Sequence, residues 1–528
     1  MIRVRQVKVG LDEDTLKGAI AKKLGILESD ILDMKIQKKS LDARKKEDIH
    51  YVYEVDVKVK NERSILKSHH KDILLTPREE YHFPKMGKEV LSSRPVVVGS
   101  GPAGLFCAYL LAEHGYRPLI LERGEKMEER VQSVSKFFEE GILNPNSNVQ
   151  FGEGGAGTFS DGKLNTMVKD KMFRGKKVFS IFVEHGAPKE IMYLQKPHIG
   201  TDLLCDIVKN IRHSIIQMGG EFRYSTCLTD IKTRHNQIVG VEINHQEVIS
   251  CSVVVLAIGH SARDTFSMLY DRGVSMVGKP FAVGVRIQHP QQMIQLSQFA
   301  TLDKRLPVAD YKLTYTTKSG RGVYSFCMCP GGYVVNASSE EGRLVVNGMS
   351  YHARDSKNAN SALVVTVGPE DFGHHSLDGM KFQQMLEEKA YLYGNGSIPV
   401  QLYDDFCHGI FSTSFGEVLP VMKGSYTFSD LNDILPNCVS SAIQEAMPVF
   451  GKKIKGFDRG DAILAGVETR TSSPVRILRN DLGEANILGL YPCGEGSGYA
   501  GGITTAAMDG IKVAEWIASK YHNLQSNS

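Results

Sequence analysis

The stretch VVVGSGPAG, residues 96–104, decides the fold of this 528-residue chain. An apolar strand runs into G-x-G-x-x-G, a helical stretch follows, and a second apolar strand ends on Glu122. Gly99 makes a tight turn, Gly101 lets the backbone approach a pyrophosphate, and Gly104 lets the helix pack closely on the sheet. The helix N-terminus favours phosphate, and the acid about twenty residues on is placed for ribose hydroxyls. The stretch predicts a dinucleotide site in a Rossmann-type α/β fold. The contact residues predicted from it are Gly99, Gly101, Pro102, Ala103, Gly104, Glu122 and Arg123.

Length and composition bound the class of protein. The chain is too long for one ordinary core, so we expect several domains. With 42% apolar residues, 23% charged residues and a net charge of +3, it gives no global argument for a nucleic-acid partner. Nine scattered cysteines and an N-terminus without a signal-peptide core favour a cytoplasmic protein with reduced thiols and no membrane association. Residues 95–112 approach the length of a membrane span, but their glycines have the dinucleotide spacing.

The pattern of elements predicts a small domain followed by a discontinuous larger one. Residues 1–60 alternate as β-α-β-β, which suits a ferredoxin-like α+β unit. The expected organisation is an N-terminal α+β domain (1–70), a linker (71–94), the first part of the dinucleotide-binding domain (95–265), a mixed α+β substrate domain (266–454) and the second part of the dinucleotide-binding domain (455–528).

A basic run lies within the N-terminal unit. Six basic side chains fall between residues 35 and 46. Such a run is typical of a solvated hairpin, and the alternative is contact with an anionic partner such as RNA or a phosphorylated ligand.

A second glycine-rich stretch, FGEGGAGTFSDGK, covers residues 151–163. Four glycines in six residues lose entropy in regular structure, so a flexible loop or a backbone lying against a ligand is expected. Thr158, Ser160 and Lys163 add donors for phosphate or ribityl oxygens. The contacts predicted here are Gly154, Gly155, Gly157, Thr158, Ser160 and Lys163.

The remaining elements complete an ordered set. A helix is expected over 202–218, and four short strands (221–225, 228–233, 238–243 and 247–250) indicate a β-meander. A buried strand then ends in Ala257-Ile-Gly259, and the C-terminal region carries Gly494-Glu495 before a helix over 503–520.

This order resembles FAD-dependent oxidoreductases of the glutathione-reductase-like superfamily. More narrowly, the phrases GEGGAGTFSDGKL, KPHIGTD, VVVLAIGHSARDTF, FAVGVRIQHP, SFCMCPGG, GVETRTSSPVRI and CGEGSGYAGG resemble the predicted FAD-dependent dehydrogenase family of bacteria over nearly the whole chain.

The resemblance implies non-covalently bound FAD. It implies that Glu122 holds the adenosine ribose, that the Leu228 backbone lies near the adenine, and that Ala257 and Gly259 let the chain pass the cofactor. Glu495 stands where the superfamily has an Asp on a ribityl hydroxyl. We further expect the N-terminus of the 503–520 helix to point at the N1/O2 edge of the flavin. The C-terminal contacts are Gly494, Glu495, Gly501, Gly502 and Ile503.

Candidates for chemistry lie mostly in the substrate domain. Cys327 and Cys329 are interpreted either as a catalytic dithiol or as packing cysteines over a flavin; on an extended strand their side chains would share a face. Arg470 either anchors an anionic group or pairs with Glu468. Further candidates for substrate contact are Tyr499, Arg286 and His289. No metal-ligand set is recognised.

The leading hypothesis is hydride transfer between FAD and a small molecule. No second strand-GxGxxG-helix unit occurs, so NAD(P)H, if it is the donor, is expected to dock transiently over residues 266–455. The alternatives are an RNA-directed flavoprotein that uses the basic N-terminal unit and a flavin redox sensor without turnover.

Overall fold

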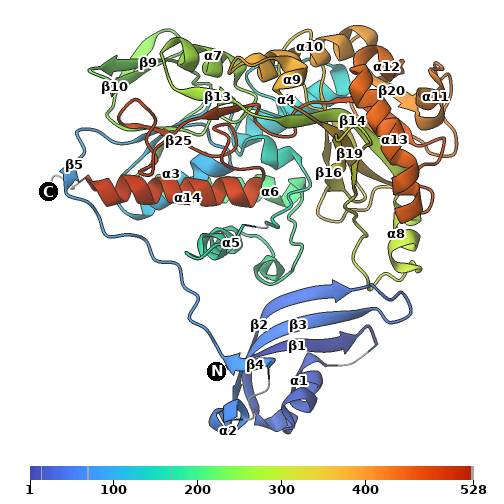
Figure 1. Cartoon of the computed structure of the whole chain (residues 1–528). Helices are drawn as coiled ribbons and strands as arrows, with labels where there is room; N and C mark the ends of the chain where they lie inside the picture. The colour runs from blue at the N-terminus through green and yellow to red at the C-terminus, as the bar shows by residue number, and fades with distance from the viewer. Residues whose placement is uncertain (13–14, 68–70, 167, 525–528) are drawn as a thin grey trace.

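The computed structural model describes residues 1–12, 15–67, 71–166 and 168–524 (Figure 1). Its N-terminal unit has the order β-α-β-β-α-β, and its antiparallel sheet runs β2-β3-β1-β4. This is the ferredoxin-like arrangement predicted, with its fourth strand inside the stretch expected to be a linker. The elements are β1 (Ile2–Gly10), α1 (Leu16–Leu24), β2 (Ile31–Asp42), β3 (His50–Val59), α2 (Glu62–Lys67) and β4 (Ile73–Leu75), with a 3₁₀ turn at Glu28–Asp30.

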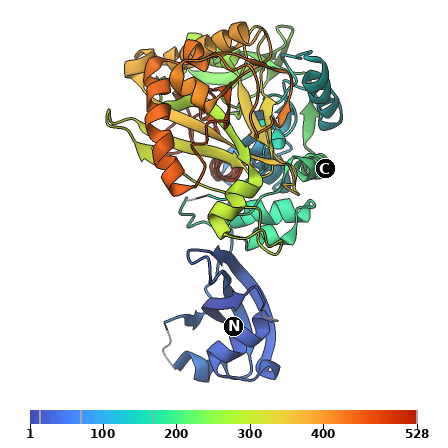
Figure 2. The ribbon, with the colours of Figure 1, turned by 90° about the vertical axis from the view of Figure 1, so that its right-hand side faces the viewer.

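The basic run of this unit lies partly on β2 and partly in the turn after it. Backbone hydrogen bonds join Lys39 to Tyr193 and Gln195 of the main body, and Lys46 Nζ donates to the Ser297 carbonyl at 2.7 Å. Arg44 pairs with Asp42. Figure 2 shows the whole unit standing to one side of the main body, with this turn facing it.

The centre of the main body is a five-stranded parallel sheet of order β25-β12-β6-β7-β8. Its middle strands are fully buried and rich in valine and leucine, as expected for a parallel sheet covered on both faces. The predicted Rossmann-type fold is thereby confirmed. The strands are β6 (Val96–Val98), β7 (Leu119–Leu121), β8 (Glu221–Arg223), β12 (Val254–Leu256) and β25 (Leu490–Pro492).

Helices cover one face of this sheet and a meander covers the other. The meander has three strands rather than the four expected, because residues 221–223 join the edge of the parallel sheet beside β7. α3 and α14 pack closely: a Cβ at Gly510 would lie 2.1 Å from the Ala103 carbonyl oxygen. The elements are α3 (Pro102–Glu113), α4 (Met127–Glu140), α5 (Arg174–Glu184), α6 (Thr201–Gln217), α7 (Arg263–Asp271), α14 (Ile503–Lys520), β9 (Leu228–Arg234), β10 (Gln237–Ile243) and β11 (Glu247–Ser250), with 3₁₀ turns at Ala156–Phe159 and Lys189–Met192.

A second, mostly antiparallel sheet forms the roof over the first. It has seven strands in the order β15-β16-β19-β14-β23-β20-β22, with the three-stranded sheet β18-β17-β21 beside it. The strands are β14 (Phe281–Pro290), β15 (Thr314–Thr316), β16 (Gly322–Cys329), β17 (Tyr333–Asn336), β18 (Val346–Met349), β19 (Asn358–Val367), β20 (Ile398–Leu402), β21 (Met422–Lys423), β22 (Tyr426–Phe428) and β23 (Ile463–Glu468). The helices are α8 (Gln291–Phe299), α9 (Pro369–Phe372), α10 (Asp378–Tyr393), α11 (Tyr403–His408), α12 (Leu431–Ile434) and α13 (Asn437–Lys453).

Two short pairings tie the sequence-distant parts together. β13 (Met276–Gly278) pairs with β24 (Val475–Ile477), and β5 (Glu89–Val90) pairs with β26 (Tyr521–His522) close to the C-terminus. Figure 1 shows the extended segment that leads from the N-terminal unit across to β5. Among the described residues, no helix combines the length and the apolar character that crossing a membrane requires.

Candidate functional site

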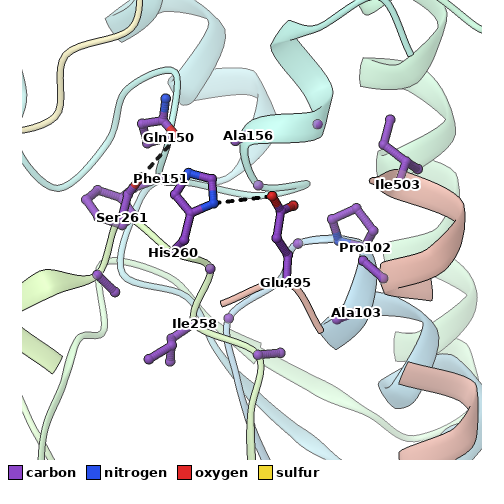
Figure 3. A pocket seen from close by; sticks show the side chains of 18 of the residues that line it. Pro102, Ala103, Gln150, Phe151, Ala156, Ile258, His260, Ser261, Glu495 and Ile503 are labelled. Atoms are coloured by element: carbon purple, nitrogen blue, oxygen red, sulfur yellow. Dashed lines mark hydrogen bonds and ion pairs between the residues drawn. The ribbon is translucent and has the colours of Figure 1, made fainter. Parts of the chain in front are cut away.

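A cavity of about 400 Å³ lies between the parallel sheet and the roof. That volume is within the range of ligand sites in proteins. Four predicted segments meet around it: the G-x-G-x-x-G turn, the second glycine-rich loop, the end of β12 and the start of α14 (Figure 3). The predicted residues that line it are Gly99, Gly101, Pro102, Ala103, Glu122, Arg123, Gly155, Gly157, Ser160, Lys163, Leu228, Ala257, Gly259, Cys327, Arg470, Glu495, Gly501, Gly502 and Ile503.

The three glycines of the first turn have different surroundings. Gly99 has φ +97°, and a Cβ there would lie 2.3 Å from the Ala257 carbonyl oxygen. A Cβ at Gly104 would lie 1.9 Å from the Gly99 carbonyl oxygen, so this glycine is needed for helix packing and does not line the cavity. A Cβ at Gly101 would meet only the Gly155 α-carbon, at 3.7 Å. The space beside Gly101 therefore belongs to the cavity, as the pyrophosphate role requires.

Glu122 organises the loops at this end of the cavity. One carboxylate oxygen accepts from the Ser100 N–H (2.9 Å) and hydroxyl (2.6 Å), and the other accepts from the N–H groups of Gly124 (2.9 Å) and Gly152 (3.0 Å). The side chain is 5% exposed and still borders the cavity. Glu122 thus fixes both glycine-rich loops at once, in addition to the ribose contact that the resemblance implies.

Arg130, which the sequence did not single out, holds the second glycine-rich loop. It is fully buried on α4 and has backbone carbonyls as its hydrogen-bond acceptors. Burial lowers its pKa to about 10. The guanidinium fixes the glycine-rich backbone of this loop and lies 4.9 Å from the ring centre of its Phe159. The acceptors are the carbonyl oxygens of Asn148 (3.0 Å), Val149 (3.1 Å), Gly152 (3.3 Å), Glu153 (2.6 Å) and Gly155 (3.0 Å).

The C-terminal motif faces the first turn across the cavity. Glu495 lies 3.3 Å from His260 Nδ1, an ion pair visible in Figure 3. Gly502 is the N-cap of α14, and as a glycine it makes no side-chain cap hydrogen bond. A Cβ at Gly501 or Gly502 would meet nothing within 4 Å. Gly501, Gly502 and Ile503 all line the cavity, and the Gly501 N–H donates to the Thr505 hydroxyl at 3.3 Å.

Polar side chains of the second glycine-rich loop and of the roof form another part of the cavity wall. Lys163 Nζ lies 2.8 Å from Asp161, which Arg354 also contacts. Burial alone would raise the pKa of Asp161, but Lys163 and Arg354 hold that pKa well below its usual range. Glu468 lines the cavity and lies 2.8 Å from the fully buried Arg286. Burial raises the pKa of Glu468 to about 7 against the opposing effect of Arg286, so protonation is within reach near neutral pH.

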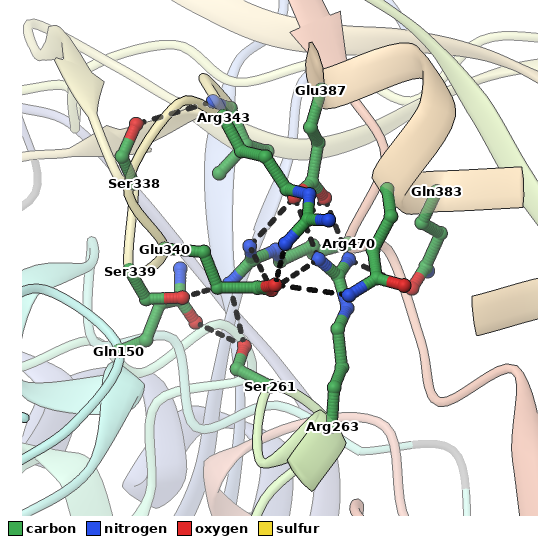
Figure 4. Close-up of polar contacts among 12 residues, drawn as sticks. Gln150, Ser261, Arg263, Ser338, Ser339, Glu340, Arg343, Gln383, Glu387 and Arg470 are labelled. Atoms are coloured by element: carbon green, nitrogen blue, oxygen red, sulfur yellow. Dashed lines mark hydrogen bonds and ion pairs between the residues drawn. The ribbon is translucent and has the colours of Figure 1, made fainter. Parts of the chain in front are cut away.

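Arg470 belongs to a buried network that joins the roof to the parallel-sheet domain (Figure 4). Its guanidinium pairs with Glu387 at 2.7 Å and donates to the hydroxyls of Ser261 (3.0 Å) and Ser339 (2.6 Å). Arg263 pairs with the same carboxylate at 2.7 Å. The ion pair between Arg470 and Glu468, one of the two sequence interpretations, is therefore wrong: Glu468 pairs with Arg286 instead.

Several predicted site residues lie outside the cavity. The Tyr499 hydroxyl donates to the Ile477 carbonyl oxygen at 3.0 Å, and its ring lies under the Arg479 guanidinium at 3.6 Å. His289 is buried, with Nε2 2.7 Å from the Phe457 carbonyl oxygen. Gly494 packs against Ala103, because a Cβ there would lie 2.5 Å from that side chain. The other predicted residues that do not line the cavity are Gly104, Gly154, Thr158, Arg286 and Cys329.

The sequence analysis missed lining residues that carry no motif. His260, Ser261 and Asp161 follow or interrupt recognised glycine stretches, so their position next to a predicted contact was the available signal. Phe326 directly precedes the predicted Cys327, whereas Asn347 comes from a roof strand with no such marker.

The fold and the cavity define a dinucleotide-binding protein of Rossmann type. Residues 97–134 match the family model of an NAD(P)-binding Rossmann-like domain, and residues 280–471 match that of an FAD-dependent protein, C-terminal domain-like. Residues 1–58 match a domain of unknown function. An uncharacterized protein of Clostridium beijerinckii is 51% identical over 530 residues, covering 98% of this chain and 99% of that one. The chain belongs to the family of that protein, and its family-model matches are those of FAD-dependent proteins.

The chain is also similar to solved structures, at low identity and with low TM-scores. Glycine oxidase from Bacillus cereus is 11% identical, with 83% of this chain and 100% of that chain covered and a TM-score of 0.37. L-proline dehydrogenase from P. horikoshii is 14% identical, with 82% and 94% covered and a TM-score of 0.34.

The cavity residues fit FAD. The α-carbon of Gly101 faces the space that a pyrophosphate needs, and the start of α14, at Gly502 and Ile503, lines the same cavity with the positive end of a helix. Between them, Glu495 borders the cavity where a ribityl chain would run.

Proposed function

We propose that the chain is an FAD-dependent oxidoreductase of the glutathione-reductase-like superfamily that moves a hydride between bound FAD and a small molecule. The observation that carries this proposal is the cavity itself, in which the G-x-G-x-x-G turn, the second glycine-rich loop and the start of α14 meet under the roof. When bound, FAD supplies the two-electron chemistry, and the protein supplies position and electrostatics.

The protein groups have separable tasks in this proposal. The Gly101 turn and the N-terminus of α3 would hold the pyrophosphate, and Leu228 would border the adenine. The start of α14 would stabilise negative charge at the N1/O2 edge through its N–H groups and its dipole. Removal of one such donor costs about 3 kcal/mol where comparable oxyanion donors have been removed.

Glu468 is the best candidate for proton transfer. It is 4% exposed, lines the cavity, and has its pKa raised to about 7 by burial. A carboxyl group that titrates near neutral pH exchanges protons efficiently at the working pH. Arg286 holds it in place with two hydrogen bonds of 2.8 and 3.0 Å. Glu468 lies in the phrase GVETRTSSPVRI, where the sequence suggested it only as an ion-pair partner of Arg470.

The substrate reaches the flavin, in this proposal, from the side walled by Phe326, Asn347 and Glu468. The charged groups on that wall are already paired, Lys163 with Asp161 and Glu468 with Arg286. A substrate of low net charge therefore fits this wall better than a dianion. NAD(P)H is proposed as an electron donor that docks there transiently, since the parallel-sheet domain contains one dinucleotide turn among the described residues.

The test is spectroscopic. Purified protein should be yellow, release FAD on denaturation, and bleach near about 450 nm under nitrogen when given the right donor. NADH, NADPH and panels of amino acids and hydroxy acids are the probes. Reduction by one of them supports the proposal. Protein that is colourless and takes up no added FAD contradicts it, and bound flavin that no donor in a metabolite extract reduces favours the redox-sensor alternative.

A further inference from the structure

The two cysteines of β16 lie at the edge of the cavity. Phe326 and Cys327 line it directly, and Cys329 is buried just behind. An unbroken strand would place these two thiols on one face with their β-carbons roughly 6–7 Å apart, too far for a disulfide. In the structure, however, β16 is interrupted at these residues.

A β-bulge interrupts β16 between Phe326 and Cys329. Phe326 pairs with Ala362 and Cys329 pairs with Asn360, so three steps on β16 match two on β19. Cys327 has φ +42°, the left-handed conformation that such a bulge imposes on the extra residue. As a result Cys329 Sγ lies 3.3 Å from the Cys327 carbonyl oxygen.

Two cations flank the pair. Arg286 donates to the Cys327 carbonyl oxygen at 2.6 Å and reaches Cys329 Sγ at 3.5 Å, and Lys163 Nζ contacts the Met328 carbonyl oxygen. The carboxylates nearest to these cations, Asp161 and Glu468, are their ion-pair partners.

The surroundings give the two thiols different acidities. A hydrogen bond from the Cys329 side chain lowers the pKa of Cys327 to about 5, against the effect of burial and together with Lys163 and Arg286. The same contact and burial raise the pKa of Cys329 well above its usual value. At neutral pH the pair is therefore one thiolate at the cavity and one thiol behind it, the state from which a disulfide forms most readily.

We propose that Cys327 and Cys329 are a redox-active pair that exchanges two electrons with the bound flavin. The proposal rests on the function proposed above, and it adds the cysteine pair as a second two-electron redox group beside FAD. In the oxidising direction an S–S bond forms between the two sulfurs, the S–H bond of Cys329 breaks, and two electrons and that proton pass to oxidised flavin. In the opposite direction, reduced flavin returns two electrons and a proton and the S–S bond breaks.

This pair also indicates a substrate class. A dithiol next to the flavin passes its electrons onward most simply by thiol–disulfide exchange, through attack of the Cys327 thiolate on a substrate sulfur. The exposed edge of the pair, Cys327, faces the cavity, and Cys329 is in place to resolve the resulting mixed disulfide. The substrate would be a small disulfide of low net charge, in accord with the paired charges on the roof wall.

The decisive experiment counts electrons. Holoprotein oxidised with diamide and freed of reagent is titrated with dithionite under nitrogen. The wild type should take up two two-electron equivalents of dithionite per protein, one to reduce the flavin and one to reduce the disulfide. The variants Cys327→Ser and Cys329→Ser should each take up one. The matched control is Cys438→Ser, on α13 away from the cavity, which should take up two. Uptake of one equivalent by the wild type overturns the proposal while leaving flavin reduction, and so the proposed function, intact.

A second measurement needs neither variants nor flavin. Trypsin releases residues 322–343 as one peptide that contains Cys327 and Cys329 and no other cysteine. After diamide, with free thiols then blocked by iodoacetamide, the peptide should be two hydrogens lighter than the dithiol form and carry no label. Reduction with dithiothreitol should restore two labelled sites. A peptide that stays fully labelled after diamide contradicts the pair even if a serine variant fails to fold, and a failure of FAD binding leaves this result unchanged.

Discussion

The two walls of the cavity are built in different ways. The lower wall consists of backbone: the turn at Gly99–Gly104, the loop that Arg130 holds by its carbonyl oxygens, and the start of α14. The roof wall consists of side chains in fixed pairs, chiefly Arg286 with Glu468 and Arg470 with Glu387. A backbone wall binds what every member of a cofactor class has in common, whereas a wall of paired side chains is where reactions and substrates are distinguished.

The two walls also depend on different interactions for their stability. In the lower wall a substitution fills space that a ligand needs. In the roof a substitution leaves a buried charge without its partner, which costs folding free energy whether or not a ligand is bound.

Gly101→Val should have the largest effect, and it should act on binding alone. Gly101 has φ −70°, which a valine adopts, and the nearest atom to its Cβ would be 3.7 Å away. The added methyl groups would occupy the pyrophosphate space, so FAD affinity should fall at least about 1,000-fold, or roughly 4 kcal/mol. Absorbance near about 450 nm and titration of FAD-free protein with FAD measure it.

Two further glycine-to-valine variants serve as controls for this test. Gly278→Val adds the same side chain to β13, outside the cavity, and should keep the protein yellow. Gly104→Val should lose the fold as well as the flavin, since its Cβ would lie 1.9 Å from a carbonyl oxygen. If Gly101→Val protein keeps its colour, the pyrophosphate lies elsewhere.

The lower wall could be predicted from the sequence because its signal is local. Each glycine prediction follows from what one turn of backbone must do, and Gly99, Gly101 and the start of the last helix line one cavity. The roof pairs join residues far apart in the chain: Arg286 and Glu468 are on neighbouring strands, but 182 positions separate them. Without the strand order, no spacing rule links them, and the closer Arg470 was the plausible but wrong partner.

Glu387→Ala should destabilise the fold most among the roof substitutions. Glu387 is fully buried and is the partner of both Arg263 and Arg470. Removal of one member of a buried ion pair typically costs about 3–5 kcal/mol. Urea unfolding of FAD-free protein measures it. Glu340→Ala removes a more exposed partner of Arg263, so its cost should be about 1 kcal/mol. Equal costs for the two would contradict the central role of Glu387.

Glu468→Gln should flatten the pH dependence of stability. In the unfolded chain the carboxyl titrates near 4.5, and in the fold burial raises its pKa to about 7. Between pH 4.5 and about 7, the Glu468 carboxyl is therefore protonated in the folded state and ionised in the unfolded state. The stability that this proton adds to the folded state is full below pH 4.5 and is lost as pH rises through about 7. At about 1.4 kcal/mol per pKa unit, the wild type should lose about 3 kcal/mol relative to Glu468→Gln over that interval. Urea unfolding across the interval measures the difference, and parallel curves for the two proteins would show that Glu468 is ionised throughout.

Tyr499→Phe should have the smallest effect, because Tyr499 supports the residues around the cavity and does not line it. The hydroxyl makes one hydrogen bond, to the Ile477 carbonyl oxygen, and the ring remains under Arg479 in the variant. Loss of that bond should cost about 1 kcal/mol of unfolding free energy. FAD affinity and the rate of flavin reduction, measured by stopped-flow absorbance, should stay within about twofold, because a stability change of this size outside the cavity moves no group that touches the cofactor. Flavin reduction that is tenfold slower in the variant would contradict this expectation. It would mean that Tyr499 contacts the reacting groups, because the start of α14 rearranges when the cavity is filled.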